Sequence, residues 1–130
     1  MRTRLALSTV PMAIAITASA LALPAAAAAS PRLNKNVTCT KGSLANLQVQ
    51  REDTGRLSLD FGVDMTRHVA GVAWRVRVTD NRSVIVSSTV RTGRDGSFSI
   101  TRTLPAATSH IVAVATNRAS GEVCRIVATV

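Results

Sequence analysis

The chain has 130 residues, of which 46% are hydrophobic and 2% aromatic, and its formal net charge at pH 7 is +9. A chain of this length holds one domain with a single core. The positive charge favours anionic partners, whereas the few aromatic residues, all expected in the core, disfavour specific recognition of single-stranded nucleic acid by stacking.

Residues 1–29 have the features of a cleavable export signal. Arg2 and Arg4 give a positive start, Val10–Leu23 is mostly apolar, and a run of alanines at 25–29 suits signal peptidase. The apolar run is shorter than the roughly 20 residues that a membrane-spanning helix needs. We therefore expect a secreted chain with no membrane span after cleavage, and with a net charge of +7.

Residues 30–38 are polar and are expected to form an exposed lead-in to a folded domain at 39–130. Beyond Cys39 the pattern is typical of strands. Residues 47–50 and 57–64 alternate apolar and polar side chains, and a break at 52–55 that contains two acids and a glycine predicts a hairpin between them.

The run from Trp74 to Thr79 continues this period of two, which directs Trp74 inward and Arg75 and Arg77 outward. Turns containing Gly, Asn or Asp separate the later runs. Further strands are predicted at about 84–92, 97–101, 110–116 and 123–130.

Seven or eight short strands with no helical segment predict an all-β fold, a single antiparallel β-sandwich. The core is expected to be largely aliphatic, because the domain has only three aromatic side chains and no tyrosine. The positions expected to be buried are Leu57, Leu59, Phe61, Trp74, Val76, Val78, Phe98 and Ile100.

Cys39 and Cys124 are the only cysteines, and an even count in an exported chain predicts a disulfide. The bond would tie the first strand region to the last. A catalytic or redox thiol is disfavoured, because no charge pattern that would activate a thiol surrounds either cysteine.

The predicted signal, Cys39, and the stretches 61–64, 71–76, 95–98 and 117–124 together resemble a group of small secreted proteins of actinomycete bacteria. Abundant arginine and an alanine-rich signal also suggest a GC-rich bacterial genome. More broadly, the chain resembles an immunoglobulin or fibronectin type III sandwich, with Trp74 in the place of the core tryptophan. Immunoglobulin domains place their cysteines on two inner strands, which Cys39 and Cys124 do not match, so the resemblance carries over no functional residue.

No motif indicates an enzyme, a metal or a cofactor. His68 and His110 are the only histidines and lie far apart in the sequence, and no serine lies in a Gly-x-Ser-x-Gly turn. Asp60 and Asp64 are expected to face solvent from one strand, where nothing raises a pKa for acid catalysis. We expect them to pair with Arg75 or Arg77 across strands.

The best candidate surface is basic and comprises Arg75, Arg77, Arg82, Arg91 and Arg94. It predicts a non-enzymatic binding module for an anionic cell-wall or other extracellular polymer. The alternative is a small-molecule carrier resembling the secreted chromoprotein apoproteins, which build on immunoglobulin-like sandwiches. A carrier requires an apolar pocket between sheets or loops, whereas a surface binder requires a flat arginine patch over a filled core.

Overall fold

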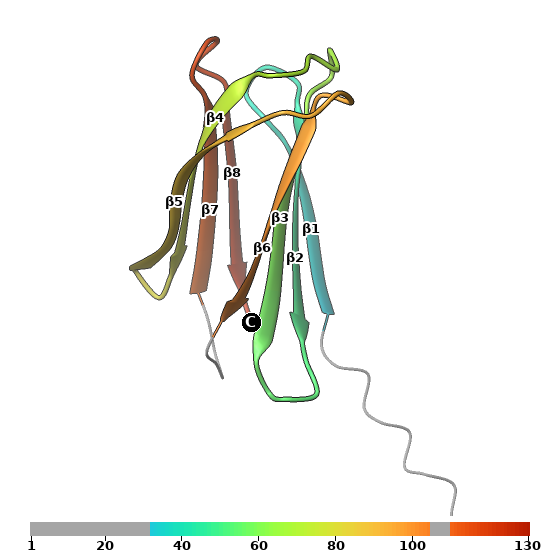
Figure 1. The fold of residues 1–130 in the computed structure, drawn as a ribbon. Helices are drawn as coiled ribbons and strands as arrows, with labels where there is room; N and C mark the ends of the chain where they lie inside the picture. Colours follow the sequence, from blue (N-terminus) through green and yellow to red (C-terminus); the bar gives the residue numbers. More distant parts are fainter. Residues whose placement is uncertain (1–31, 105–109) are drawn as a thin grey trace, which may run out of the picture.

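The computed structural model describes residues 32–104 and 110–130, which form eight β-strands in two packed antiparallel sheets (Figure 1). The strand order is β1-β2-β3-β6 in one sheet and β5-β4-β7-β8 in the other. The strands are β1 (Arg32–Thr38), β2 (Leu44–Arg51), β3 (Leu57–Asp64), β4 (Ala73–Asp80), β5 (Ser83–Arg91), β6 (Ser97–Leu104), β7 (His110–Asn117) and β8 (Val123–Thr129). The prediction of an all-β sandwich is confirmed, and the predicted signal at 1–29 lies outside the described residues.

The core lies between the two sheets and is built from alternate residues of each strand. All eight side chains expected to be buried are buried, from Trp74 and Phe61 at 0% exposure to Phe98 at 8%. The Trp74 and Phe98 rings lie 5.9 Å apart at an interplanar angle of 51°, a tilted arrangement that aromatic pairs favour. Because alternation buries one side of each strand, it also fixes which residues face solvent.

Residues 32–38 form an edge strand instead of the irregular lead-in that their composition indicated. Strand β1 pairs with β2 along its whole length, from Arg32 opposite Gln50 to Thr38 opposite Leu44. Only Leu33 and Val37 are partly buried. A strand with only two inward apolar side chains gives a weak alternating pattern in the sequence. Its stability comes instead from backbone pairing with β2.

The two sheets are joined where β1 and β8 approach each other. Cys39 and Cys124 form a disulfide with a Cα–Cα distance of 4.5 Å, which confirms the predicted pairing. Beside it, the Thr40 amide donates to the Val123 carbonyl at 3.1 Å, and the Val123 amide donates to the Thr40 hydroxyl at 2.9 Å. The bond therefore closes the sandwich along one side.

Replacing both Cys39 and Cys124 by alanine should lower the free energy of unfolding by about 4 to 5 kcal/mol, because a closed loop of this length restricts the unfolded chain. Urea unfolding of the parent and the variant under oxidising conditions measures the loss. Reductant should destabilise the parent and leave the variant unchanged. A loss below about 1 kcal/mol would contradict the chain-entropy account.

The loops β1–β2, β3–β4, β5–β6 and β7–β8 gather at one end of the sandwich, the upper end in Figure 1. Gly96 packs the β5–β6 loop against the β3–β4 loop, with its carbonyl accepting a hydrogen bond from the Met65 amide at 3.0 Å. Gly96 has a φ of +76°, and a Cβ atom there would lie 2.4 Å from the His68 Cα. No residue except glycine fits this contact without moving the backbone.

Gly96→Ala should therefore destabilise the fold by at least about 2 kcal/mol more than Gly55→Ala. Gly55 is the matched control because it also has a positive φ, +82°, but nothing lies within 4 Å of an added Cβ. Both variants place an alanine in the left-handed backbone region, which is unfavourable in each. Only Gly96→Ala also brings a Cβ atom too close to the His68 backbone. Equal losses of stability for the two variants in thermal or urea unfolding would contradict this prediction. They would show that the β3–β4 and β5–β6 loops move apart to make room for the added Cβ atom.

Candidate functional site

An arginine face, defined by Arg75, Arg77 and Arg125, lies on the outside of the β5-β4-β7-β8 sheet. Arg75 and Arg77 point outward from β4, where Trp74, Val76 and Val78 fill the core. In the register of the sheet, Arg77 pairs with Val114 of β7, and Val114 pairs with Arg125 of β8. Standard strand geometry places Arg75 and Arg77 about 7 Å apart along β4. It places Arg77 and Arg125 about 10 Å apart across the sheet.

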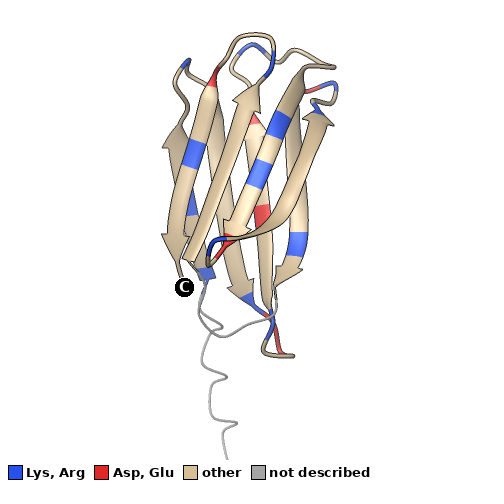
Figure 2. Cartoon of the chain, turned by 90° about the vertical axis from the view of Figure 1, so that its left-hand side faces the viewer, with Lys and Arg blue, Asp and Glu red and all other residues tan. Residues whose placement is uncertain are grey.

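No carboxylate of the described residues neutralises this face. Asp80 is the one acid on these four strands, and its Oδ1 atom is buried. Within residues 32–104 and 110–130, no ion pair or hydrogen bond engages the three guanidinium groups. Figure 2 looks onto this sheet and shows blue segments midway along its front strands.

The expected pairing of Asp60 and Asp64 with the β4 arginines is wrong. Both acids lie on β3, which belongs to the other sheet, and Asp60 lies between Gln48 and Thr101 there. The chain crosses between sheets in the β3–β4 loop, so residues that are close in sequence end on opposite outer faces. The arginine face is left unpaired for this reason.

The other predicted arginines are divided between the face and the two ends of the sandwich. Arg91, at the end of β5, lies outward beside Ala73 and donates to the Gly71 carbonyl at 3.0 Å. Arg82 lies in the β4–β5 turn and Arg94 in the β5–β6 loop, at opposite ends. Sequence analysis missed Arg125, although alternation between the buried Cys124 and Ile126 marks it as outward.

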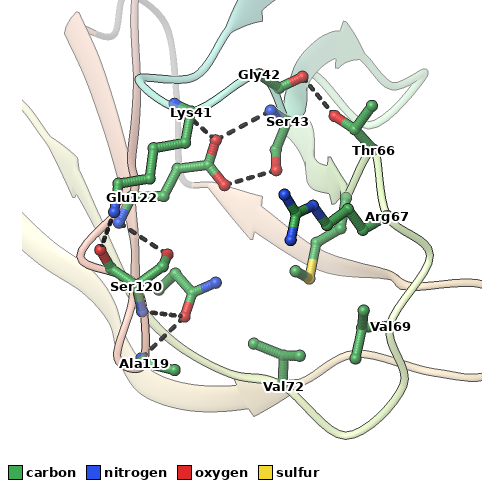
Figure 3. Close-up of a pocket in the computed structure, with 12 residues that line it drawn as sticks. Lys41, Gly42, Ser43, Thr66, Arg67, Val69, Val72, Ala119, Ser120 and Glu122 are labelled. Atoms are coloured by element: carbon green, nitrogen blue, oxygen red, sulfur yellow. Dashed lines mark hydrogen bonds between the residues drawn. The ribbon is translucent and has the colours of Figure 1, made fainter.

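A second candidate is a cavity of about 620 Å³ at the loop end, here called the loop-end cavity (Figure 3). The β1–β2, β3–β4 and β7–β8 loops line it, and it is open to solvent on one side. Its wall is apolar at Met65, Val69 and Val72, and its rim carries Lys41 and Arg67. Sequence analysis did not find it, because the loops have no periodic pattern and meet only through the fold.

Glu122 holds two of these loops together from a buried position. It is 3% exposed, and its carboxylate accepts hydrogen bonds from the Ser43 hydroxyl at 2.6 Å, the Ser43 amide at 3.0 Å and the Lys41 amide at 2.9 Å. Burial opposes ionisation, but the Ser43 and Lys41 hydrogen bonds and the Lys41 charge outweigh it and lower the pKa of Glu122. The ionised carboxylate thus ties the β7–β8 loop to the β1–β2 loop.

Glu122→Gln should cost about 2 kcal/mol of stability at pH 7, because a neutral amide replaces the charged acceptor of the Ser43 and Lys41 hydrogen bonds. Since folding lowers the pKa of Glu122, ionisation stabilises the fold above the usual pKa near 4.5, and that contribution is lost as the pH falls below it. The difference between the parent and Glu122→Gln in urea unfolding should therefore be full at pH 7 and shrink by pH 3.

Glu52 is the matched control for this substitution, because it is the only other glutamate in the chain and lies exposed in the β2–β3 turn. Glu52→Gln should change the free energy of unfolding by less than about 0.5 kcal/mol at pH 7. A pH-independent loss in Glu122→Gln would contradict the role of the charge.

The outer face of the other sheet is uncharged over much of its area. A shallow depression of about 230 Å³ lies there, with Asn36, Asn46 and Gly62 in its lining. The Asn46 amide donates to the side-chain oxygens of Asn34 and Asn36 at 2.7 and 2.6 Å. These amides satisfy one another, so the depression presents less unused hydrogen-bonding capacity than the arginine face.

Other kinds of site find no support within residues 32–104 and 110–130. His68 and His110 lie at opposite ends of the sandwich, and no cluster of three or more histidine, cysteine or acidic side chains is placed to hold a metal ion there. The same residues contain no helix with the length and apolar character needed to cross a bilayer.

Comparisons of the chain with protein-family models, curated proteins and solved structures found no match.

Proposed function

We propose that this protein is a secreted, non-enzymatic binding module that engages anionic extracellular or cell-wall polymers through the arginine face. The observation that carries the proposal is the position of Arg75, Arg77 and Arg125 on one sheet face, with no carboxylate of the described residues beside them. The core beneath is filled, with Trp74 and Val76 at 0% exposure.

Arginine suits such a partner chemically. Its planar guanidinium binds carboxylates, sulfates and phosphates in a bidentate manner. Charges about 7 to 10 Å apart are separated by roughly one Debye length, which is about 8 Å at physiological salt, so the three act together on a long polymer. A sheet face that is open along its length also accepts an extended chain in several registers, which fits a polymer better than a compact ligand.

One observation and one feature predicted from the sequence support the secreted location. Cys39 and Cys124 form a disulfide, and such bonds persist in non-reducing compartments. The export signal predicted at 1–29 accords with that compartment.

The immunoglobulin-like type is supported by strand order. Strands β2-β3-β6 and β4-β7-β8 match the A-B-E and C-F-G orders, with β5 beside β4 as in variable domains and β1 added at the edge.

Replacing Arg75 and Arg77 by glutamate should abolish retention on heparin, used as a polyanion probe, and on isolated cell wall. The charge reversal turns local attraction into repulsion while leaving the inward side of β4 unchanged. Salt should elute the parent protein, because the Debye length falls from about 10 Å at 0.1 M to about 3 Å at 1 M. The measurement is the salt concentration at elution.

The matched control is Arg32→Glu with Arg56→Glu, which changes the net charge equally on exposed residues away from the β5-β4-β7-β8 sheet. This control should be retained far more strongly than the β4 variant. Equal retention of the two double variants would show that only total charge matters, and the arginine face would then have no specific role.

The loop-end cavity favours a second candidate function, a small-molecule carrier. It lies between loops at the end of the sandwich, with an apolar wall that includes Met65, Val69 and Val72. Its volume of about 620 Å³ is in the range of ligand pockets. The two functions use different surfaces of the molecule and do not exclude each other.

A further inference from the structure

We propose that the loop-end cavity binds an amphipathic carboxylate, a molecule with an aliphatic chain and one carboxylate head, with the chain against the apolar wall and the head on Arg67. This proposal gives a ligand class to the carrier function. It does not depend on the arginine face, which lies on the outside of a sheet and contributes no residue to the cavity.

The wall of the cavity supplies the apolar half of the site. Met65 and Val72 are partly buried against the core, and Val69 is 44% exposed at the cavity. Val69 is one of the few large apolar side chains that the fold leaves exposed. An aliphatic chain lying on these three residues would remove apolar surface from water, which favours binding.

The charges at the rim select an anionic head. Glu122 is 3% exposed and its carboxylate already accepts three hydrogen bonds, so it has little left to offer a cation. The Lys41 ammonium donates to the Ser120 carbonyl. The Arg67 guanidinium has no ion pair or hydrogen bond to any described residue, and Figure 3 shows it extending over the cavity toward Glu122.

The β3–β4 loop that carries Arg67 is held at several points without a ligand. The Thr66 hydroxyl donates to the Gly42 carbonyl at 2.6 Å, and the His68 amide donates to the Met65 carbonyl at 3.0 Å. The buried Thr92 hydroxyl donates to the Val69 carbonyl at 2.6 Å and accepts from the Val72 amide at 2.9 Å. A loop fixed in this way loses little entropy when a ligand binds.

Methyl NMR of the full-length chain labelled with [¹³C-methyl]methionine tests the proposal directly. The chain has three methionines, Met1, Met12 and Met65, and Met65 is the one in the cavity lining. Titration with dodecanoate should shift the Met65 methyl signal in a saturable manner. Acetate, which lacks the chain, and dodecanol, which lacks the charge, should bind at least about tenfold more weakly.

Three variants locate the head group. Arg67→Gln should weaken dodecanoate binding about tenfold or more and leave dodecanol binding unchanged, whereas Arg67→Lys should retain part of the affinity. Arg94→Gln is the matched control, because Arg94 is exposed at the same end of the sandwich but does not line the cavity. It should bind dodecanoate as the parent does.

The absence of a saturable Met65 shift would overturn the proposal. Equal affinities for dodecanoate and dodecanol, equal losses in Arg67→Gln and Arg94→Gln, or tighter binding of dodecyltrimethylammonium would overturn the assignment of an anionic head. The variant with glutamate at positions 75 and 77 should bind dodecanoate normally. A failure of heparin binding and a failure of this site are therefore distinguishable.

Discussion

Burial of Trp74 fixes the orientation of strand β4, and the outward direction of Arg75 and Arg77 follows from it. Trp74, Val76 and Val78 are all at 0% exposure, so rotating the strand or shifting its register by one residue would place two arginines in the core. The cost of burying unpaired charges excludes that alternative. The arginine face is thus maintained by the packing beneath it, and its own side chains need make no contacts to stay in place.

The crossover from β3 to β4 separates the charges of the molecule. If these consecutive strands formed a hairpin in one sheet, Asp60 and Asp64 would lie near the arginines and neutralise them. Placing β3 and β4 in different sheets puts the acids on a face rich in amides and hydroxyls and leaves Arg75 and Arg77 beside Ser87, Thr89 and other uncharged residues. The electrostatic asymmetry of the surface is therefore a consequence of topology.

Sequence patterns predicted the features that depend on local alternation. Phe61, Trp74 and Phe98 are buried as expected because each lies on the apolar side of a period-two run. The same patterns could not show which strands share a sheet, and the expected pairing of Asp60 with β4 was wrong for that reason. The polar composition of residues 32–38 also gave no indication of strand β1, whose stability comes from pairing with β2.

The loop-end cavity was unpredictable for a related reason. The hydrogen bonds that shape it connect residues far apart in the chain, such as Ser43 and Glu122. A serine and a glutamate in two loops carry no signal of their own. By contrast, Arg125 could have been found, since it lies between Cys124 and Ile126 in an alternating run.

The disulfide and the Glu122 network act on the same pair of chain segments. Cys39 is the first residue of the β1–β2 loop, which also contains Ser43, and Cys124 lies two residues beyond Glu122. The covalent bond brings the β1–β2 and β7–β8 loops together, and the hydrogen bonds of the ionised carboxylate then set their relative position. Because those loops form one wall of the cavity and the β3–β4 loop forms the other, the shape of the cavity depends on a bond that a non-reducing compartment preserves.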